Sequence, residues 1–508
     1  MSPVATNSNL ARLAEAAYER RGDYESLLFE GRWHSSGELF ERSCRIAGGL
    51  VELGVAPGER VAVTMANRPE VSVVYQALWR AGAVVTPATF LLGAEDLRHV
   101  IADSGACAVV TTSEFVDKVA QAVAGLDTVR HVICTDGGDE HGITALAELE
   151  RSEPAPIVAR DDDDLAALLY TGGTTGRAKG VMLSHANLFF STRGVQKASY
   201  VPGVRRSLMT LPLSHSYGLL VTVSAMHSPE RPVTVLLRWF DPAAFLELIA
   251  EHRLQTSAVV PSMIHLLLAQ PLERHDLSSL VYLGCGAAPL SPSAAEEIER
   301  RIPSVTVRQG YGLTETAALI STNPAGREKP GSVGLPIPGV TVGIFDDDGR
   351  ELPAGEAGEI CCRSPAVMRG YWHAREATAE ALRDGWLHTG DVGYLDEDGY
   401  LFIVDRKKDL IIRGGFNVYP RDVEDALLEH PAVTAAGVIG RPDERHGEEV
   451  VAFVSLTSPG AVTEDDLVEW ARRRIGGYKY PREVHIIEAI PLTAVGKLDR
   501  KALRGRLL

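Results

Sequence analysis

The sequence predicts an α/β protein with a large N-terminal domain and a small, mobile α+β C-terminal domain. Apolar runs of strand length alternate with helical patterns over most of the chain before Val340. From about Val340 the pattern changes to short strands separated by Gly and Asp turns, which is typical of a β-rich lobe. Because 508 residues exceed one ordinary hydrophobic core, we expect at least two domains.

The N-terminal domain is predicted to hold two subdomains, each built on a sheet. The first begins with a helix from Ser35 that stops near Gly54, and continues with strands at 61–65, 83–86 and 108–112 and helices at 69–80 and 95–102. The second has helices at 243–252 and 292–301 and strands at 258–260, 281–283 and 305–308. Such alternation predicts parallel sheets with crossover helices.

A separate unit is predicted after Asp405. Its segments read as helix 421–428, strands 433–439 and 450–456, helix 464–474 and strand 484–487. We therefore divide the chain into residues 1–405 and 406–508, with a hinge at 405–409.

Composition and charge narrow the class of protein. The net charge of −16 offers no basic footprint, so we expect no nucleic-acid partner. Six cysteines show neither a CxxC pair nor a His spacing suited to zinc, which favours buried, reduced thiols. No secretion signal and no apolar run of membrane-spanning length is evident, so we expect a cytoplasmic protein without a membrane span.

The segment TGGTTGRAKG at 171–180 has the composition of a polyphosphate-binding loop. Glycines let backbone N–H groups approach oxyanions, hydroxyl groups add donors and a lysine adds charge. The candidate residues are Thr171, Gly172, Gly173, Thr174, Thr175, Gly176 and Lys179. We expect the loop to lie between the buried strand 165–170 and a helix that starts near Ser184. Its spacing is not that of a Walker A motif, and a mobile surface turn is the alternative.

Four later motifs occur in a fixed order with this loop: YGLTET at 311–316, GWLHTGD at 385–391, DRKKDLIIRGG at 405–415 and PLTAVGK at 491–497. Together the five motifs resemble the adenylate-forming superfamily of acyl-CoA synthetases, luciferases and nonribosomal peptide adenylation domains. The resemblance covers nearly the whole chain and is strongest to acyl-CoA ligases of fatty or aromatic acids.

The resemblance implies an ATP-dependent acyl-CoA ligase that uses ATP, Mg²⁺ and coenzyme A. Glu315 would hold Mg²⁺, Thr314 would donate to the α-phosphate and Lys497 would stabilise charge during adenylation. Further residues of the ATP and AMP site would be Gly286, Ala287, Ala288, Gln309, Gly310, Tyr311, Gly312, Asp391, Ile403 and Arg406. GCGAAP at 284–289 also resembles a dinucleotide fingerprint, but it lacks the third glycine.

The resemblance also implies which residues bind the acid and the thiol. His215 would gate the carboxylate pocket, whose walls would include Ser216, Tyr217, Val260, Gly284, Cys285 and Ala317. Lys408 would be the pivot about which the C-terminal domain alternates between two closed states. Coenzyme A would meet Gly414, Gly415, Tyr478, Lys479 and Arg482, although a basic end of a surface helix explains the last three equally well.

Some alternatives stay open. The acceptor thiol can belong to a carrier protein instead of coenzyme A, the enzyme can be specialised for one half-reaction, and the chain can form a homodimer. A non-catalytic adenylate-binding regulator is disfavoured because Glu315 and Lys497 are both present, and a serine hydrolase because no GxSxG elbow occurs. One departure is Ala178, where relatives usually have proline; a more flexible loop and slower adenylation are expected.

Overall fold

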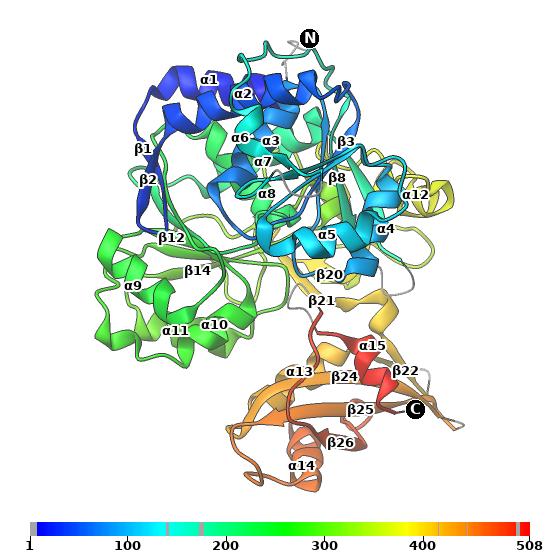
Figure 1. Cartoon of the computed structure of the whole chain (residues 1–508). Coiled ribbons are helices and arrows are strands. Elements are labelled where there is room, and N and C mark those ends of the chain that lie inside the picture. Colours follow the sequence, from blue (N-terminus) through cyan, green and yellow to red (C-terminus); the bar gives the residue numbers. More distant parts are fainter. Residues whose placement is uncertain are drawn as a thin grey trace. The chain divides into compact units, whose positions relative to one another are not determined.

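The computed structural model describes residues 8–138, 142–171, 177–414, 416–443, 445–493 and 498–507. The chain divides into two compact units, one formed by residues 1–341 with 362–387 and the other by 342–361 with 388–508. Figure 1 shows the helices and strands of each unit. The predicted α/β fold class is confirmed, whereas the boundary at residue 405 and the hinge near Lys408 stay predictions.

The first unit contains a seven-stranded sheet in the order β7-β6-β5-β3-β4-β8-β9. Its strands are β3 (Arg60–Val63), β4 (Val84–Pro87), β5 (Ala108–Thr111), β6 (His131–Cys134), β7 (Thr144–Ala145), β8 (Leu165–Thr171) and β9 (Lys179–Ser184). All neighbours pair in parallel except β8 and β9. Because both faces of such a sheet are covered, its strands read as continuous apolar runs in the sequence.

Helices α2 (Ser36–Glu52), α3 (Pro69–Arg80), α4 (Ala94–Ser104) and α5 (Val116–Val123) accompany this sheet. The side chain of Ser35 caps α2 by accepting from the N–H of Glu38, and Pro69 occupies the first turn of α3. Trp79 on α3 is fully buried and donates its Nε1–H to the carbonyl of Ala166 on β8, at 2.9 Å. The helices predicted at 69–80 and 95–102 are confirmed.

The prediction for the segment after the phosphate loop was wrong in one respect. We expected a helix near Ser184, and α7 (His185–Ser199) does begin there, with a capping box between Ser184 and Asn187. The strand β9, however, separates the loop from this helix and runs antiparallel to β8. Residues 179–184 are apolar enough to complete the sheet edge, and their short length concealed the strand in the sequence.

The second sheet of this unit has nine strands in the order β16-β15-β14-β13-β12-β10-β11-β1-β2. Its strands are β1 (Glu25–Phe29), β2 (Arg32–Ser35), β10 (Arg206–Met209), β11 (Val233–Leu236), β12 (Thr256–Val259), β13 (Tyr282–Cys285), β14 (Thr306–Tyr311), β15 (Ser321–Thr322) and β16 (Leu335–Pro336). Helices α9 (Pro242–His252), α10 (Pro261–Leu268) and α11 (Pro292–Arg301) share one apolar core with it. Each of these helices starts at a proline.

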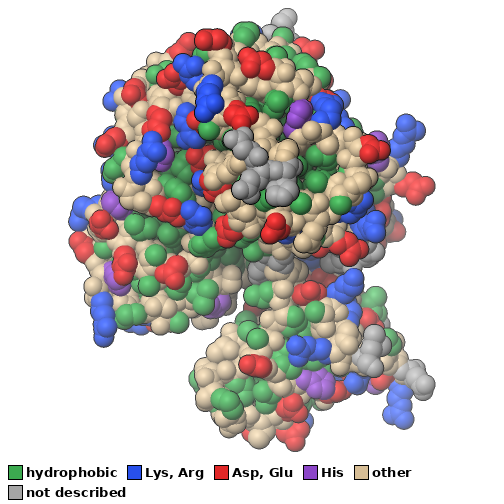
Figure 2. Space-filling view, in the orientation of Figure 1, with side chains coloured by type: hydrophobic (Ala, Val, Ile, Leu, Met, Phe, Trp, Pro, Cys, Tyr) green, Lys and Arg blue, Asp and Glu red, His purple; other side chains and the backbone are tan. Residues whose placement is uncertain are grey.

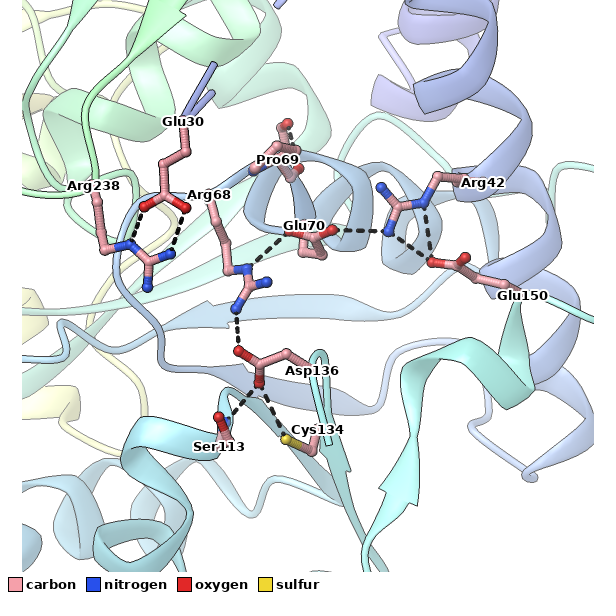
Figure 3. Close-up of polar contacts among 11 residues, drawn as sticks. Glu30, Arg42, Arg68, Pro69, Glu70, Ser113, Cys134, Asp136, Glu150 and Arg238 are labelled. Atoms are coloured by element: carbon pink, nitrogen blue, oxygen red, sulfur yellow. Dashed lines mark hydrogen bonds and ion pairs between the residues drawn. The ribbon is translucent and has the colours of Figure 1, made fainter. Parts of the chain in front are cut away.

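A chain of ion pairs links separate elements of the first unit (Figure 3). Arg42 on α2 contacts Glu70 at 2.9 Å and Glu150 at 2.8 Å, while Arg68 contacts Glu70 at 2.9 Å and Asp136 at 2.7 Å. The two arginine side chains are no more than 21% exposed, so these pairs are screened less than ordinary surface pairs. The network holds α2 and α3 against the loop after β6.

The second unit contains the C-terminal sheet in the order β23-β22-β25-β24, with β26 beside β25. Its elements are β22 (Ile411–Arg413), β23 (Phe416–Val418), α13 (Pro420–Leu428), β24 (Val433–Asp443), β25 (Gly447–Leu456), α14 (Glu464–Arg474), β26 (Glu483–Ile486) and α15 (Arg500–Gly505). The predicted order of helix, two strands, helix and strand is confirmed. The β-rich lobe expected after residue 340 is a sheet of β17 (Thr341–Phe345), β18 (Gly358–Arg363), β20 (Trp386–Leu395) and β19 (Leu382–Arg383), with β21 (Leu401–Arg406) beside β20.

Surface and cysteine features agree with ordinary globular packing. Figure 2 shows acidic and basic side chains intermixed over the visible face of each unit. All six cysteines are buried, as the sequence predicted. Within the part of the chain that the structure describes, no helix has both the length and the apolar character needed to cross a membrane.

Acid is expected to destabilise the first unit through His185. This side chain is buried, its Nδ1 accepts a hydrogen bond from the N–H of Leu10 at 3.2 Å, and burial lowers its pKa to about 4. Because the unfolded chain binds a proton at the ordinary value of 6.5 and the folded chain does not, stability is lost as pH falls from 6.5 towards 4. The expected loss is about 3 kcal/mol.

Urea unfolding followed by tryptophan fluorescence at about pH 7 and about pH 4.5 tests this expectation. Five of the six tryptophans lie in the first unit, so the signal reports mainly on that unit. His185→Gln keeps an acceptor for Leu10 but cannot take up the proton, and its midpoint should depend less on pH. The same dependence in both proteins would contradict the assignment.

Candidate active site

Three parallel strands of the nine-stranded sheet, β12, β13 and β14, bring most predicted acyl and adenine residues to one edge. The register pairs Val259 with Cys285 and Cys285 with Gln309, so the carboxyl ends of β12, β13 and β14 are level. Val260, Gly284, Gly286 and Gly310 therefore lie on neighbouring strand ends of this edge. In open α/β sheets, ligands bind outside the carboxyl ends of the strands.

Close backbone approaches explain why several of these positions are glycine. A Cβ atom on Gly286 would lie 3.1 Å from the carbonyl oxygen of Gly310, and one on Gly312 would lie 1.9 Å from that of Ala318. Ala287 has a φ of 70°, a left-handed conformation that a non-glycine residue rarely adopts. Observed strain of this kind is common at ligand sites, which supports the predicted adenine role of 286–288.

The segment after β10 (Arg206–Met209) reaches the same edge. His215 caps helix α8 (Ser216–His227), and its Nδ1 accepts from the N–H of Tyr217 at 3.3 Å. The Tyr217 hydroxyl donates to the carbonyl of Gly284 at 3.3 Å, and burial raises the pKa of this phenol. The Thr314 hydroxyl donates to that of Ser216 at 3.4 Å. The structure thus brings together five predicted residues, namely His215, Ser216, Tyr217, Gly284 and Thr314.

Two further residues of the predicted acyl pocket, Cys285 and Ala317, and one of the predicted ATP site, Gln309, lie on or next to the segments just described. Cys285 is 2% exposed, and burial raises the pKa of its thiol to about 12, so it is a neutral wall residue. Ala317 is also 2% exposed and has a φ of 51°, and its carbonyl accepts from the Ser191 hydroxyl at 3.0 Å. Gln309 accepts from the N–H of Asn323 through its backbone carbonyl at 3.0 Å.

Tyr371 links the predicted metal ligand to the predicted phosphate lysine. Its hydroxyl donates to Oε1 of Glu315 at 2.8 Å, and Nζ of Lys179 lies 5.3 Å from the centre of its ring. Burial and the Glu315 charge raise the pKa of Tyr371, so the phenol stays neutral. Glu315 is held further by its backbone carbonyl, which accepts from the N–H of Met368 at 2.8 Å. A positioned carboxylate of this kind suits Mg²⁺, which prefers oxygen ligands.

The phosphate loop itself lies only partly within the described residues. Gly172, Gly173, Thr174, Thr175 and Gly176 lie outside them. The flanking residues Thr171 and Lys179 pair across β8 and β9. At the far end of the loop, Nε2 of His99 on α4 contacts the carbonyl of Ala178 at 2.8 Å. His99 could not be predicted from the sequence, because this contact joins positions 79 residues apart.

The predicted ribose residues lie in the second unit. Asp391 on β20 and Arg406 on β21 are directly opposite in the register, and Nε of Arg406 lies 3.2 Å from Oδ1 of Asp391. Asp391 is 5% exposed, and the Arg406 side chain is 40% exposed. Ile403 lies on the same strand, opposite Gly393. The fifteen positions that separate Asp391 from Arg406 in sequence therefore form one antiparallel hairpin.

The candidate hinge and coenzyme A residues belong to the second unit as well. Lys408 is exposed in a short 3₁₀ turn, Lys407–Asp409, and Gly414 has a φ of 58°. Tyr478 is 37% exposed, with its ring centre 5.0 Å from that of Phe416. Lys479 pairs with Asp422 at 2.6 Å, and Arg482 donates to the Gly477 carbonyl at 2.8 Å. Gly415 and Lys497 lie outside the described residues.

Comparison with protein-family models matches residues 13–372 to the AMP-binding enzyme family and residues 422–497 to the AMP-binding enzyme C-terminal domain. The chain belongs to the AMP-binding enzyme family. It is 39% identical to a feruloyl-CoA synthase from an Amycolatopsis species, over 92% of this chain and 93% of that protein. It is 34% identical to a long-chain-fatty-acid–CoA ligase of Salmonella typhimurium, over 98% and 94%.

Solved structures of similar proteins have the same fold. o-Succinylbenzoate CoA synthetase from Bacillus subtilis, solved with its acyl-adenylate intermediate, superposes with a TM-score of 0.85 at 30% identity over 97% of each chain. The predicted family, fold and reaction class, that of an AMP-forming acyl-CoA ligase, are confirmed by these comparisons. Members of this class use ATP and coenzyme A.

Removing the His99 contact is expected to weaken ATP binding. His99→Ala leaves the Ala178 carbonyl without its imidazole donor and loosens the loop that ends in Lys179. We expect the KM for ATP to rise about five- to tenfold, with a smaller change in kcat, because a hydrogen bond contributes about 1 kcal/mol. His131→Ala is the matched control, since its Nε2 contacts the carbonyl of Leu53 at 3.1 Å, remote from the loop in sequence. An equal rise in both variants would contradict a positioning role for His99.

Proposed function

We propose that this enzyme activates a hydrophobic carboxylic acid as an acyl-AMP and transfers the acyl group to coenzyme A. A carboxylate oxygen attacks the α-phosphorus of ATP, the bond to pyrophosphate breaks, and an acyl adenylate forms. The thiol sulfur then attacks the acyl carbon, AMP leaves with the carboxylate-derived oxygen, and the thiol proton passes to solvent. Splitting the reaction replaces an oxide leaving group by AMP.

Residues of both units are proposed to share the electrostatic stabilisation of the first step. Lys179 would bind phosphate oxygens, and Thr314 would donate to the α-phosphate. Glu315 would hold Mg²⁺, which when bound neutralises phosphate charge. Tyr371 positions the Glu315 carboxylate through the 2.8 Å hydrogen bond. Lys497 would add a further positive charge where the carboxylate meets the α-phosphate.

The acid is proposed to carry an aromatic ring, and the environment of Tyr217 is the observation that carries this proposal. A Cβ atom on Gly284 would lie 3.4 Å from the Tyr217 hydroxyl, and one on Gly286 would lie 3.8 Å from its ring. The phenol group thus lies beside two positions without side chains, with its hydroxyl near Gly284 and one ring edge near Gly286. A flat wall of this kind suits an aryl group, since offset stacking is favourable. The identity to a feruloyl-CoA synthase supports the same class.

A long-chain fatty acid is the second candidate. It is supported by the 34% identity to a long-chain-fatty-acid–CoA ligase over 98% of this chain. A panel of hydroxycinnamic, benzoic and saturated fatty acids, scored separately for pyrophosphate release and thioester formation, distinguishes the two. We expect the hydroxycinnamic acids to give the highest kcat/KM. A higher value for fatty acids would replace the aryl proposal while leaving the reaction class unchanged.

Tyr217→Leu, assayed with the same panel of acids, tests whether the substrate stacks on the Tyr217 ring. It removes the flat wall but keeps an apolar side chain, so the loss should be larger for aryl acids than for fatty acids. Equal losses for both would argue against stacking on this ring.

The proposed function also includes an acceptor thiol, a movement of the C-terminal residues, a ribose site and a cellular compartment. Coenzyme A is the proposed acceptor, a carrier-protein thiol is the alternative, and thioester yield with each acceptor decides between them. The C-terminal residues are proposed to move about Lys408 between the two steps, and Gly414, Gly415, Tyr478 and Lys479 to meet coenzyme A. Asp391, Arg406 and Ile403 are proposed to bind the ribose. Six buried thiols support a reducing compartment such as the cytoplasm.

A further inference from the structure

Three potential metal ligands gather in the second unit, outside the residues assigned to the reaction. Glu359 and Cys361 lie two residues apart on β18, and His388 lies on β20, its neighbour in the sheet. Nδ1 of His388 lies 3.3 Å from Sγ of Cys361 and 3.3 Å from Oε2 of Glu359. All three ligand atoms lie within 4.8 Å of one another. Side chains two apart on a strand share one face, so the backbone itself directs both towards His388.

The ligand types and distances fit a zinc ion. Thiolate, imidazole and carboxylate are the three protein ligands that zinc takes, with bonds of about 2.3 Å to sulfur and about 2.0 Å to nitrogen or oxygen. Tetrahedral bonds of these lengths place sulfur about 3.5 Å from nitrogen, and nitrogen about 3.3 Å from oxygen. Both printed separations from Nδ1 of His388, 3.3 Å to the sulfur and 3.3 Å to the carboxylate oxygen, are close to these values, so small side-chain shifts would admit the ion.

Neighbouring groups hold the cluster in place. The N–H of Gly390 donates to Oε1 of Glu359 at 3.3 Å, which leaves Oε2 directed at His388. The Thr389 hydroxyl donates to the carbonyl of Ile360 at 2.7 Å and ties the two strands together. Supporting contacts of this kind orient metal ligands and raise affinity.

Charge also favours a cation. Glu359 is 8% exposed and Cys361 is fully buried, so a carboxylate and a thiolate here require positive charge nearby. Nζ of Lys407 lies 3.5 Å from Oε2 of Glu359 but only 2.7 Å from Asp347, its closer partner. Lys407 can therefore stay paired with Asp347 when a divalent ion takes its place beside Glu359.

We propose that Glu359, Cys361 and His388 form a binding site for a thiophilic divalent cation, Zn²⁺, with water as the fourth ligand. Binding exchanges the Cys361 thiol proton, released to solvent, for a bond from sulfur to the metal. The ion would join β18 to β20 three residues before Asp391. Its effect would be to stabilise the second unit. The proposal is independent of the acyl substrate and of the two-step reaction.

A second cluster of potential metal ligands in the described residues is a weaker candidate for a cation site. Asp443, His446 and Glu449 also lie within ligand distance of one another. Arg413 grips both oxygens of Glu449, at 2.6 and 3.0 Å, so a cation would have to break a bidentate ion pair.

Cobalt titration of the full chain, first treated with chelator, tests the site. Co²⁺ is the probe because a thiolate ligand gives it an intense near-ultraviolet absorption band. We expect one equivalent to produce this band, Zn²⁺ to abolish it, and about one proton to be released per bound ion at neutral pH. The absence of a saturable band would overturn the proposal.

Two variants assign the ligands. Cys361→Ser should remove the band, whereas Cys362→Ser is the matched control, since Cys362 is equally buried but points to the opposite face of the strand. His388→Gln should weaken cobalt binding about tenfold or more. Retention of the band in Cys361→Ser, or its equal loss in Cys362→Ser, would overturn the assignment. If Cys361→Ser does not fold, His388→Gln decides: unchanged affinity overturns the proposal.

Discussion

Lys497→Ala is expected to lower carboxylate-dependent pyrophosphate exchange about 100- to 1,000-fold. The lysine is proposed to stabilise charge that develops as the carboxylate attacks the α-phosphate, and removal of one such preorganised donor commonly has an effect of this size. Conversion of supplied acyl-AMP to acyl-CoA should stay largely intact, because that step no longer joins two anions at the α-phosphate. Assaying both half-reactions with the same variant checks the prediction.

Lys501→Ala is the matched control, since it removes an exposed lysine from α15, four positions beyond Lys497. It should leave both half-reactions close to wild type. Equal loss of both half-reactions in Lys497→Ala would count against the role proposed for Lys497.

A bulky replacement at Gly415 is expected to have the opposite effect to Lys497→Ala, with thioester formation impaired more than adenylation.

Glu315→Gln is expected to lower adenylation about 100-fold and to raise the Mg²⁺ concentration needed for half-maximal rate. Glutamine retains a carbonyl oxygen that can accept from the Tyr371 hydroxyl, so the change isolates the negative charge. Loss of a charged ligand weakens the hold on a hard cation. Pyrophosphate exchange measured across a range of Mg²⁺ concentrations provides the readout.

Tyr371→Phe tests the positioning of the Glu315 carboxylate without changing its charge. It removes the 2.8 Å hydrogen bond to Glu315 but keeps the carboxylate, so we expect a loss of about tenfold or less. An unchanged Mg²⁺ requirement in Glu315→Gln would rule out a metal role for this residue.

The sequence predicted an element of the fold well where its local signals, such as a proline at the helix start and an apolar face, agreed. The helix at 69–80 has proline at its first position and an apolar face, and the structure shows it unchanged. The strand β9 was missed because six residues between a loop and a helix leave too little room for a periodic pattern. Pairing with β8, a tertiary effect, decides its conformation.

The candidate site was predictable only where motifs carried it. Asp391 and Arg406 were proposed as one ribose site, and they form an ion pair on adjacent strands. Their roles stay predictions, as do those of Glu315 and Lys179. No motif pointed to Tyr371 or His99, because each acts through a contact between segments distant in sequence.

The cysteine pattern shows the same limit. Cysteine and histidine spacing along the chain gave no indication of zinc, yet Cys361 and His388 meet across neighbouring strands, 27 residues apart. Metal ligands on adjacent strands follow the register of the sheet, and the register depends on packing that a linear spacing rule does not contain.

Transfer of oxygen from the acid to AMP tests whether the carboxylate attacks the α-phosphate of ATP. The enzyme is given ATP, coenzyme A and an acid labelled in both carboxylate oxygens with ¹⁸O, and the nucleotide product is examined by mass spectrometry. We expect AMP that carries one labelled oxygen, together with a singly labelled thioester. Unlabelled AMP, or ADP with the label in inorganic phosphate, would contradict this mechanism.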